Sequence, residues 1–255
     1  MLRKLWKLWK LWKLRKLRKL RKLWTIRTIP TIRPLNPNPM QTAALFDLDG
    51  VLVDTESQYT QFWATIAQRD FPNDPDFAIR IKGHTLTQIY AAYYPERPER
   101  QAEIAAELVH FEQRMSYPLI EGALNFVAQL RAQGIPTAIV TSSNHDKMQC
   151  LLQAHPDFPQ LFDRIFTAED ALRSKPAPDC YLNAARHFGL EASSCFVFED
   201  SLNGLRAAQA SQATVIGLTT SHPAAVIAPY CCYTMPHFGS FTVGHMLNLQ
   251  ATDKN

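Results

Sequence analysis

The stretch AALFDLDGVLVDTE (residues 43–56) places two aspartates, Asp47 and Asp49, directly after an apolar run with the length of a buried strand. Carboxylates avoid surroundings of low dielectric constant unless a cation or another partner compensates them. In an extended segment residues i and i+2 point the same way, so both carboxylates can face one site. The stretch is therefore either a strand end with acidic turn residues or half of a site for a metal ion and a phosphate.

The apolar pattern changes character along the chain. Residues 55–118 carry three stripes of apolar side chains at helical spacing, beginning at Tyr59, Leu86 and Ile104, and no convincing strand. Beyond them, strands predicted at residues 136–142, 162–168, 194–200, 213–218 and 230–235 alternate with predicted helices, of which those near 124–134, 144–154, 178–188 and 202–211 have the clearest pattern. Alternation of strands and helices predicts an α/β fold with a Rossmann-like parallel sheet core.

The helical block interrupts this alternation directly after the first strand. We therefore expect residues 55–118 to form an inserted α-helical cap domain, and residues 40–54 and 119–255 to form the core domain. Open α/β sheets bind ligands beyond the carboxyl ends of their strands, so functional side chains should gather there.

Residues 1–39 are a basic, low-complexity tail with a three-residue repeat that drifts from LWK to LRK to TIR. A three-residue step moves each lysine by about −60° around a helix, so no fixed polar face results. No uncharged run is long enough to span a membrane. A repeat of this kind is what a tandem nucleotide repeat encodes, and we expect the segment to be a mis-assigned start before Met40, or else disordered or bound to a surface.

Charge is divided unevenly along the chain. The tail holds 13 basic and no acidic residues, whereas the other 216 residues hold 14 basic and 23 acidic ones. An acidic body gives no electrostatic reason to expect nucleic-acid binding. Five cysteines without a C-x-x-C pair are typical of a reduced, cytoplasmic protein. We expect a monomer, with membrane binding only if the tail is real.

Chemistry-bearing residues follow several of the predicted strands. They are Asp47 and Asp49 after the first strand, Thr141 and Ser142 after the second, Lys175 in the loop SKPAPD, and Glu199 with Asp200 at the end of the strand FVF. Clustered carboxylates repel one another unless a cation lies among them, and ligands that are all oxygen suit Mg²⁺. A carboxylate nucleophile, a hard metal ion and an anion cradle together indicate phosphoryl transfer through an aspartyl-phosphate.

In its motifs the chain resembles the haloacid dehalogenase (HAD) superfamily, in the subgroup similar to beta-phosphoglucomutase-like sugar phosphatases. DLDGVLVDTE, IVTSS, SKPAPD and FEDSLNG match the four motifs of that superfamily, in order, and the likeness extends from about residue 43 to 235. The resemblance implies the HAD fold, the helical cap after the first strand and a Mg²⁺-dependent phosphoric monoester hydrolase acting on a small phosphorylated metabolite.

The resemblance also implies a role for each motif residue. Asp47 resembles the nucleophile, Asp49 the general acid and base, Thr141 the hydroxyl that binds the phosphoryl group, and Lys175 the cation that neutralises it. Asp47, Asp200 and the backbone carbonyl of Asp49 resemble Mg²⁺ ligands, and Glu199 resembles a direct or water-mediated one. Gly50 and Ser142 are expected beside the phosphate, where Gly50 permits a close backbone turn.

Substrate choice is expected to depend on the cap. Lys82 and His84 lie in a predicted turn that faces the active site in this family, so both are candidate substrate-binding residues. Beta-phosphoglucomutases resemble one another in carrying a histidine and an arginine at the positions that correspond to Tyr59 and Leu86 here. Neither residue can hold a second phosphate ionically, which favours hydrolysis of a sugar or polyol phosphate over a mutase reaction.

Other functions are alternatives to a sugar or polyol phosphatase. A phosphosugar mutase is the first alternative, and hydrolysis of pyrophosphate is the next. Dehalogenation is disfavoured because the enzymes that perform it usually lack the second aspartate, which is present here as Asp49. From a different class, the basic tail could serve membrane or nucleic-acid binding, or the fold could be retained for binding alone.

Overall fold

The structure, a computed structural model, describes residues 42–252. Within them a six-stranded parallel sheet has the strand order β3-β2-β1-β4-β5-β6. The strands are β1 (Ala43–Phe46), β2 (Thr137–Val140), β3 (Arg164–Phe166), β4 (Cys195–Glu199), β5 (Thr214–Leu218) and β6 (Tyr233–Met235). Because β1 lies between β2 and β4, its carboxyl end is at the point where the strand order reverses, and ligands bind open sheets at that point.

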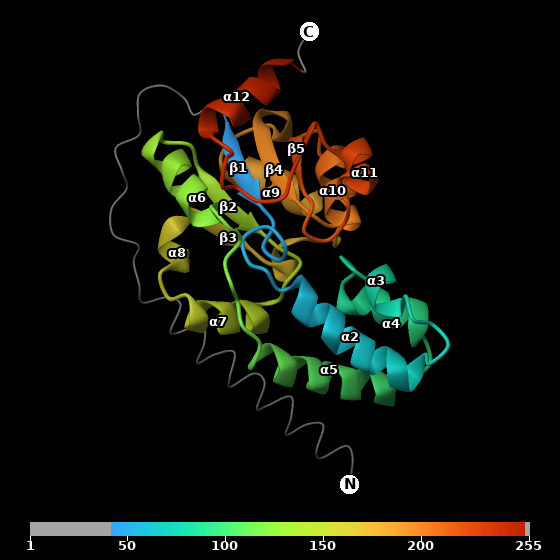
Figure 1. The fold of residues 1–255 in the computed structure, drawn as a ribbon. Helices are drawn as coiled ribbons and strands as arrows, with labels where there is room; N and C mark the ends of the chain where they lie inside the picture. The colour runs from blue at the N-terminus through green and yellow to red at the C-terminus, as the bar shows by residue number, and fades with distance from the viewer. Residues whose placement is uncertain (1–41, 253–255) are drawn as a thin grey trace. The chain divides into compact units, whose positions relative to one another are not determined.

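Helices cover both faces of this sheet (Figure 1). On one face lie α6 (Ala123–Ala132), α7 (His145–Ala154), α8 (Phe158–Leu161) and α12 (Val243–Thr252). On the other lie α9 (Asp179–His187), α10 (Leu202–Ala210) and α11 (Ala224–Ile227). Short 3₁₀ turns occur at η1 (Ala168–Asp170), η2 (Ala192–Ser194) and η3 (Ala228–Tyr230). The sheet is therefore the middle layer of three, as expected for parallel strands buried on both sides.

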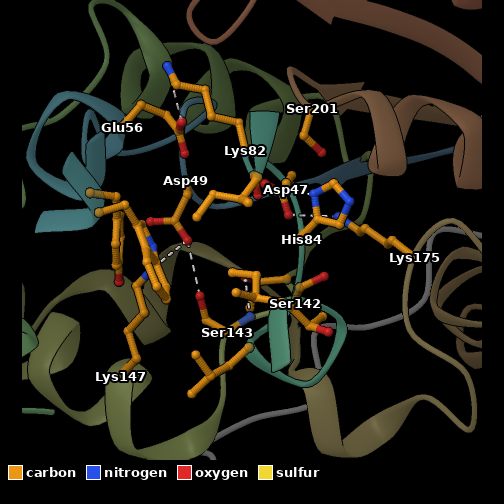
Figure 2. Close-up of a pocket in the computed structure, with 18 of the residues that line it drawn as sticks. Asp47, Asp49, Glu56, Lys82, His84, Ser142, Ser143, Lys147, Lys175 and Ser201 are labelled. Atoms are coloured by element: carbon orange, nitrogen blue, oxygen red, sulfur yellow. Dashed lines mark hydrogen bonds and ion pairs between the residues drawn. The ribbon is translucent and has the colours of Figure 1, made fainter. Parts of the chain in front are cut away.

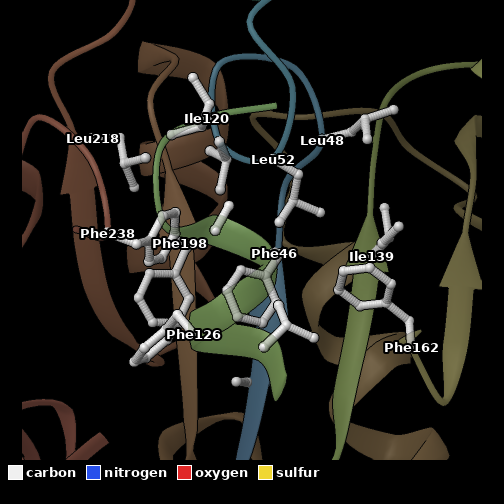
Figure 3. Packing of buried hydrophobic residues seen from close by; sticks show 14 of the residues in the cluster. Phe46, Leu48, Leu52, Ile120, Phe126, Ile139, Phe162, Phe198, Leu218 and Phe238 are labelled. Carbon is white, nitrogen blue, oxygen red and sulfur yellow. The ribbon is translucent and has the colours of Figure 1, made fainter. Parts of the chain in front are cut away.

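Aromatic packing is concentrated on the first face of the sheet. The rings of Phe46 on β1 and Phe198 on β4 are stacked with their centroids 4.6 Å apart, and Phe126 of α6 meets both edge-on (Figure 3). The residues that follow the two stacked rings are Asp47 and Glu199. Hydrophobic contact beneath the strand ends thus fixes the positions from which two carboxylates emerge.

Four helices lie between β1 and α6 in the chain: α2 (Glu56–Asp70), α3 (Phe77–Arg80), α4 (Leu86–Tyr93) and α5 (Pro98–Glu112). We call them the inserted helices, and Figure 1 shows them grouped apart from the helices that flank the sheet. They share an apolar cluster of their own, in which Trp63, Phe77 and Ile104 are buried. Because this apolar cluster is separate, the inserted helices pack against one another without contributing to the core around the sheet.

The inserted helices are also hydrogen-bonded to the rest of the chain. The Asn203 side-chain amide donates to the carbonyl of Gly83 over 3.1 Å. The Gln88 amide donates to the carbonyl of Lys175 over 2.8 Å. These contacts join α4 and the turn before it to the first turn of α10 and to the loop that carries Lys175.

The predicted α/β fold with its helical insert after the first strand is confirmed. Differences concern the ends of elements. The third stripe belongs to a helix that begins at Pro98, ahead of the first apolar residue of the stripe. The strand predicted at YCCYTM covers only Tyr233–Met235, so the pair Cys231 and Cys232 precedes it, and Cys232 is exposed. The short helices α3 and α8 and the terminal helix α12 were not expected from the pattern.

The predictions for the basic tail fall on residues outside the described range. Among residues 42–252, none of the helices combines the length and the apolar character that crossing a membrane requires.

Candidate active site

A cavity of about 220 Å³ opens between the strand ends and the inserted helices (Figure 2). It brings together residues predicted from four separate motifs, namely Asp47, Asp49, Thr141, Ser142, Lys175, Glu199 and Asp200. Lys82 and His84 line it from the turn before α4. Gly50, which was expected beside the phosphate, is not among the residues that line the cavity. It has φ of +73°, and a Cβ atom there would stand 2.0 Å from Oδ2 of Asp200, so its lack of a side chain makes room for that carboxylate.

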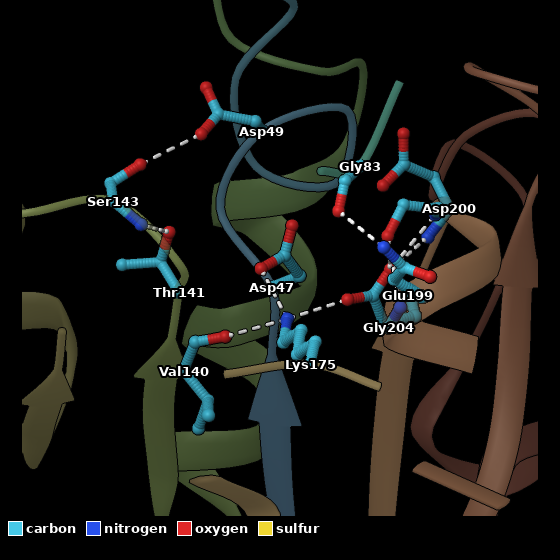
Figure 4. Close-up of polar contacts among 12 residues, drawn as sticks. Asp47, Asp49, Gly83, Val140, Thr141, Ser143, Lys175, Glu199, Asp200 and Gly204 are labelled. Carbon is cyan, nitrogen blue, oxygen red and sulfur yellow. Dashed lines mark hydrogen bonds and ion pairs between the residues drawn. The ribbon is translucent and has the colours of Figure 1, made fainter. Parts of the chain in front are cut away.

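Lys175 is a buried cation that lines this cavity (Figure 4). Its Nζ donates to Oδ1 of Asp47 over 2.7 Å, to Oε1 of Glu199 over 2.6 Å and to the carbonyl of Val140 over 3.2 Å. All three N–H groups of the ammonium therefore have acceptors. One lysine thus ties together the ends of β1, β2 and β4.

Glu199 is completely buried and uses both of its carboxylate oxygens. Oε1 accepts from Lys175 and from the Tyr181 hydroxyl, and Oε2 accepts from the backbone N–H groups of Asp200 and Ser201. A Cβ atom on Gly204 would stand 1.6 Å from Oε1, so only glycine fits at that position of α10. Glu199 therefore fixes the loop after β4 as well as the lysine.

Asp47, Glu199 and Asp200 form an acidic cluster. One carboxylate oxygen from each lies within 4.8 Å of the others, and all three residues are buried. Oδ2 of Asp200 accepts from the hydroxyls of Thr220 and Ser221, in the loop after β5. Buried oxygen donors at this spacing are the ligand set that a hard divalent cation prefers.

Asp49 shares the cavity with Asp47 but has different partners. Its carboxylate accepts from the hydroxyl of Thr55, from that of Ser143 over 3.0 Å and from Nζ of Lys147 over 2.5 Å. Figure 4 shows Asp49 directed away from Asp47. Asp47 and Asp49 face one cavity, as expected, but the extended segment assumed for them is not observed, because the chain turns through residues 48–52 after β1.

The loop after β2 supplies hydroxyl and backbone groups. Oγ1 of the buried Thr141 accepts from the N–H of Ser143 over 3.0 Å, which holds the loop closely curved. Thr141, Ser142, Ser143 and the helix N-cap Asn144 all line the cavity. Backbone N–H groups before the first turn of a helix are well placed for an anion.

The turn formed by Lys82, Gly83 and His84 closes the cavity from the side of the inserted helices. Nζ of Lys82 lies 3.7 Å from Oε2 of Glu56, so Glu56 also faces the cavity, a point that its sequence position left undecided. A Cβ atom on Gly83 would stand 2.8 Å from Cβ of Ser201. The turn thus touches the loop that carries Asp200.

Two residues that line the cavity, Glu112 and Lys147, were not singled out from the sequence, and neither was Thr55, which donates to Asp49 without lining the cavity. The first two have unfavourable places in their helices. Lys147 stands in the first turn of α7 and Glu112 is the last residue of α5, and each has the charge that its end of a helix disfavours.

The titration of these groups reflects burial and close charges. Burial raises the pKa of Asp47 to about 7, and the charge of Lys175 opposes that rise. Burial and the charge of Glu199 raise the pKa of Asp200 well above its usual range. Burial also disfavours the charge on Asp49, but Lys147 and the hydroxyl donors outweigh it and lower its pKa. The acidic cluster is therefore electrostatically strained without a divalent cation.

The metal-free protein should lose stability as the pH rises. The pKa of Asp47 is 3.8 in the unfolded chain and about 7 in the folded protein. The contribution of this group to the free energy of unfolding is therefore complete below pH 3.8 and is lost as the pH rises to about 7 and beyond. We expect the thermal midpoint with EDTA to fall between pH 5 and pH 8, and Mg²⁺ to restore most of the loss. The Asp47→Asn variant serves as control and should show a smaller fall. An equal fall in both proteins would contradict the assignment to Asp47.

Comparison with known proteins agrees with this geometry. Residues 41–212 match the family described as haloacid dehalogenase-like hydrolase. Validoxylamine A 7'-phosphate phosphatase from Streptomyces hygroscopicus subsp. limoneus is 30% identical over 74% of this chain and 91% of its own length. Hexitol phosphatase A from Escherichia coli is 31% identical over 68% of this chain and 81% of its own.

The fold also resembles that of a solved structure. The crystal structure of a HAD hydrolase, family IA, variant 3, from Entamoeba histolytica superposes with a TM-score of 0.73 and 26% identity, over 82% of this chain and 99% of that one. The family match covers most of the residues that the structure describes, including every strand except β5 and β6. This chain therefore belongs to the haloacid dehalogenase-like hydrolases, and it is an enzyme of the phosphoric monoester hydrolase type.

Proposed function

We propose that this enzyme hydrolyses a small sugar or polyol phosphate through an aspartyl-phosphate on Asp47, with Mg²⁺ as cofactor. One observation carries the proposal. The ammonium of Lys175 lies 2.7 Å from Asp47 and 2.6 Å from Glu199, beside a cluster of three buried carboxylates. The charge of Lys175 opposes the rise in the Asp47 pKa that burial causes, and it lies where the negative charge of a phosphoryl group can be held.

The first step would join Asp47 to the substrate. An oxygen of its carboxylate attacks phosphorus, and the bond from phosphorus to the ester oxygen breaks. Asp49, protonated once it has left the donors that lower its pKa, gives its proton to the departing alcohol. For this Asp49 has to leave Thr55, Ser143 and Lys147 and turn towards Asp47. In the second step Asp49 takes a proton from water, which attacks phosphorus and returns Asp47 to its free form.

The phosphoryl group would be held by Lys175, by the hydroxyl of Thr141 and by backbone N–H groups near Ser142. Lys175 is already fixed by three acceptors, so it needs no reorganisation when charge develops. Burial acts to lower the pKa of this lysine, but the charges of Asp47 and Glu199 raise it well above its usual value. It therefore stays a cation throughout turnover.

The donor set fits Mg²⁺ at the acidic cluster. Asp47, Asp200 and the backbone carbonyl of Asp49 are the ligands we propose, with Glu199 acting through water because its two oxygens already have protein donors. The bound ion would neutralise charge on the phosphoryl oxygens and on the clustered carboxylates. Thr220 and Ser221 would keep Asp200 oriented as supporting residues.

We further propose that residues 55–118 act as a cap domain over a core of residues 40–54 and 119–255. The inserted helices have their own apolar cluster, and they reach the core through the polar contacts of Gly83 and Gln88. Hydrogen bonds of this kind can break and reform without exposing apolar surface. Lys82 and His84 would then meet the substrate when the cap is closed.

Hydrolysis is favoured over a mutase reaction by the residues at the inner wall. Tyr59 is hydrogen-bonded to Glu112 over 2.9 Å, and Leu86 is apolar, so neither position offers a cation for a second phosphate. The relatives named for hexitol and validoxylamine phosphates also support a phosphatase with a hydroxylated leaving group. We propose in addition that the enzyme is a cytoplasmic monomer, consistent with the free thiols of Cys150, Cys180 and Cys195.

The test is phosphate release by the full chain from a panel of sugar and polyol phosphates, with Mg²⁺ and with EDTA. We expect turnover of at least one ester with Mg²⁺ and a loss of at least about 100-fold with EDTA. A control reaction follows conversion of a hexose 1-phosphate into its 6-phosphate. Isomerisation without net phosphate release would establish the mutase instead, and no reaction by the folded protein would refute both.

A further inference from the structure

Two buried residues of opposite charge line the cavity, one from the inserted helices and one from the core. Lys147 comes from α7 and Glu112 from α5, and both line the cavity. Only 7% of the Lys147 side chain is exposed to solvent, and Glu112 is 8% exposed. A lysine at a helix N-terminus and a glutamate at a helix C-terminus each cost stability, as does their burial. Residues that break local preferences in this way are expected at functional positions.

The ammonium of Lys147 is directed into the cavity (Figure 2). It contacts Oδ2 of Asp49 over 2.5 Å and lies 4.4 Å from the centre of the Tyr59 ring. The Tyr59 hydroxyl donates to Oε1 of Glu112, and the charges of Lys147 and Glu112 attract each other. A cationic donor and an anionic acceptor thus both contact Tyr59, and the cation also contacts the carboxylate that would protonate the leaving group.

Turnover would disturb this arrangement. When Asp49 turns towards the ester oxygen, Lys147 loses its closest acceptor while it remains buried. A buried ammonium that lacks an acceptor is costly, so the substrate has to supply one. An alkyl leaving group supplies none.

The overall charge of the cavity decides which acceptor is suitable. Among residues 42–252, six acidic side chains line it (Asp47, Asp49, Glu56, Glu112, Glu199 and Asp200), against three lysines (Lys82, Lys147 and Lys175). A second anionic group on the substrate would add to this excess of negative charge. A hydroxyl avoids that cost, and it can accept from Lys147 while donating to Glu112.

We propose that Lys147 and Glu112 are specificity-determining residues that bind a hydroxyl group of the leaving alcohol, close to the ester oxygen. The inference rests on the proposed hydrolysis and narrows its substrates to neutral, hydroxylated phosphomonoesters. It also connects substrate recognition with the release of Asp49, because Lys147 exchanges the Asp49 carboxylate for the substrate hydroxyl as its acceptor.

Three esters with the same carbon skeleton test the proposal. Glycerol phosphate carries hydroxyls beside the ester, propyl phosphate carries none, and phosphoglycerate esterified at its terminal carbon adds a carboxylate. The parent enzyme should show a kcat/KM for glycerol phosphate that exceeds the value for each of the others by about tenfold or more. Phosphate release by the full chain with Mg²⁺ is the measurement.

Variants of Lys147 and Glu112 distinguish recognition of the substrate hydroxyl from a purely structural role of the two residues. Lys147→Gln should lower kcat for every ester, since Asp49 loses a partner, but it should also reduce the preference for glycerol phosphate over propyl phosphate by about fivefold or more. Lys147→Arg should keep part of that preference. Glu112→Gln should reduce the same preference and improve the relative turnover of phosphoglycerate. The matched controls are the exposed His145→Gln on α7 and Glu103→Gln on α5, which should leave all ratios unchanged.

The ratios of kcat/KM among the three esters decide whether the inference holds. A parent enzyme without preference for glycerol phosphate, or Lys147 and Glu112 variants that slow all three esters equally, would overturn the inference. Circular dichroism identifies any variant that fails to fold, and the remaining variant of the pair still gives the ratio. If the parent enzyme releases phosphate from p-nitrophenyl phosphate yet shows no preference, only this inference fails. If it releases phosphate from no ester at all, the proposed function fails with it.

Discussion

Replacement of Asp47 by asparagine is expected to reduce kcat/KM for every phosphomonoester by roughly 10⁴-fold or more while the protein remains folded. An amide nitrogen replaces one carboxylate oxygen and removes the negative charge, so the side chain no longer attacks phosphorus. The remaining oxygen can still accept from Lys175, as Oδ1 of Asp47 does now. Phosphate release measures the loss of activity, and circular dichroism measures whether the variant remains folded.

The same variant gives a sharp control for the role of Asp47. Burial already favours the neutral form at this position, so asparagine should not lower the thermal midpoint at pH 8 without metal. A variant of Asp54, which is exposed and close by in sequence, should retain activity. Substantial turnover by Asp47→Asn would place the covalent step elsewhere and would refute the aspartyl-phosphate mechanism.

Replacement of Lys175 by methionine should be the most damaging change to stability in the site. It leaves Asp47 and Glu199 as neighbouring buried carboxylates without their shared cation. Breaking a buried ion pair from one side costs about 3–5 kcal/mol of unfolding free energy, and activity should fall with it. Urea unfolding at pH 7.5 with EDTA measures the loss. Added Mg²⁺ should recover part of it, because a second cation can take over some of the compensation.

Arg173 provides the matched control for that experiment. It lies two residues away and pairs with Asp179, but 69% of its side chain is exposed. Exposed ion pairs contribute about 1 kcal/mol or less, so Arg173→Met should change stability little. If Lys175→Met were as stable as Arg173→Met, the charge balance described for the acidic cluster would be wrong.

Much of the fold could be predicted because it rests on short-range patterns. Each predicted strand from 42–47 to 213–218 contains an observed strand, and the apolar stripe from Tyr59 matches α2. Strand order could not be read in this way, since pairing of β1 with both β2 and β4 depends on contacts between distant residues. The four-residue helices α3 and α8 are too short to show a period. The start of α5 was missed because its first turn is polar.

The motifs located the cavity but not the contacts within it. Asp47, Lys175, Glu199 and Asp200 meet as expected from strand ends at one edge of a parallel sheet. The motifs do not reveal that Asp49 has its own set of donors, because Lys147 is 98 residues away in the sequence. A lysine in the first turn of the helix predicted near 144–154 would have indicated Lys147 from the sequence, whereas the place of Glu112 at a helix end became known only from the structure.

The stacked rings of Phe46 and Phe198 have a mechanical consequence for the acidic cluster. Each ring is bonded through a single peptide group to a carboxylate, Asp47 in one strand and Glu199 in the other. The repulsion between the two acids acts to spread β1 and β4, and any spreading would separate the rings that lie directly behind them. The apolar contact between the two rings therefore resists the separation of β1 and β4 that repulsion between the next residues, Asp47 and Glu199, would cause.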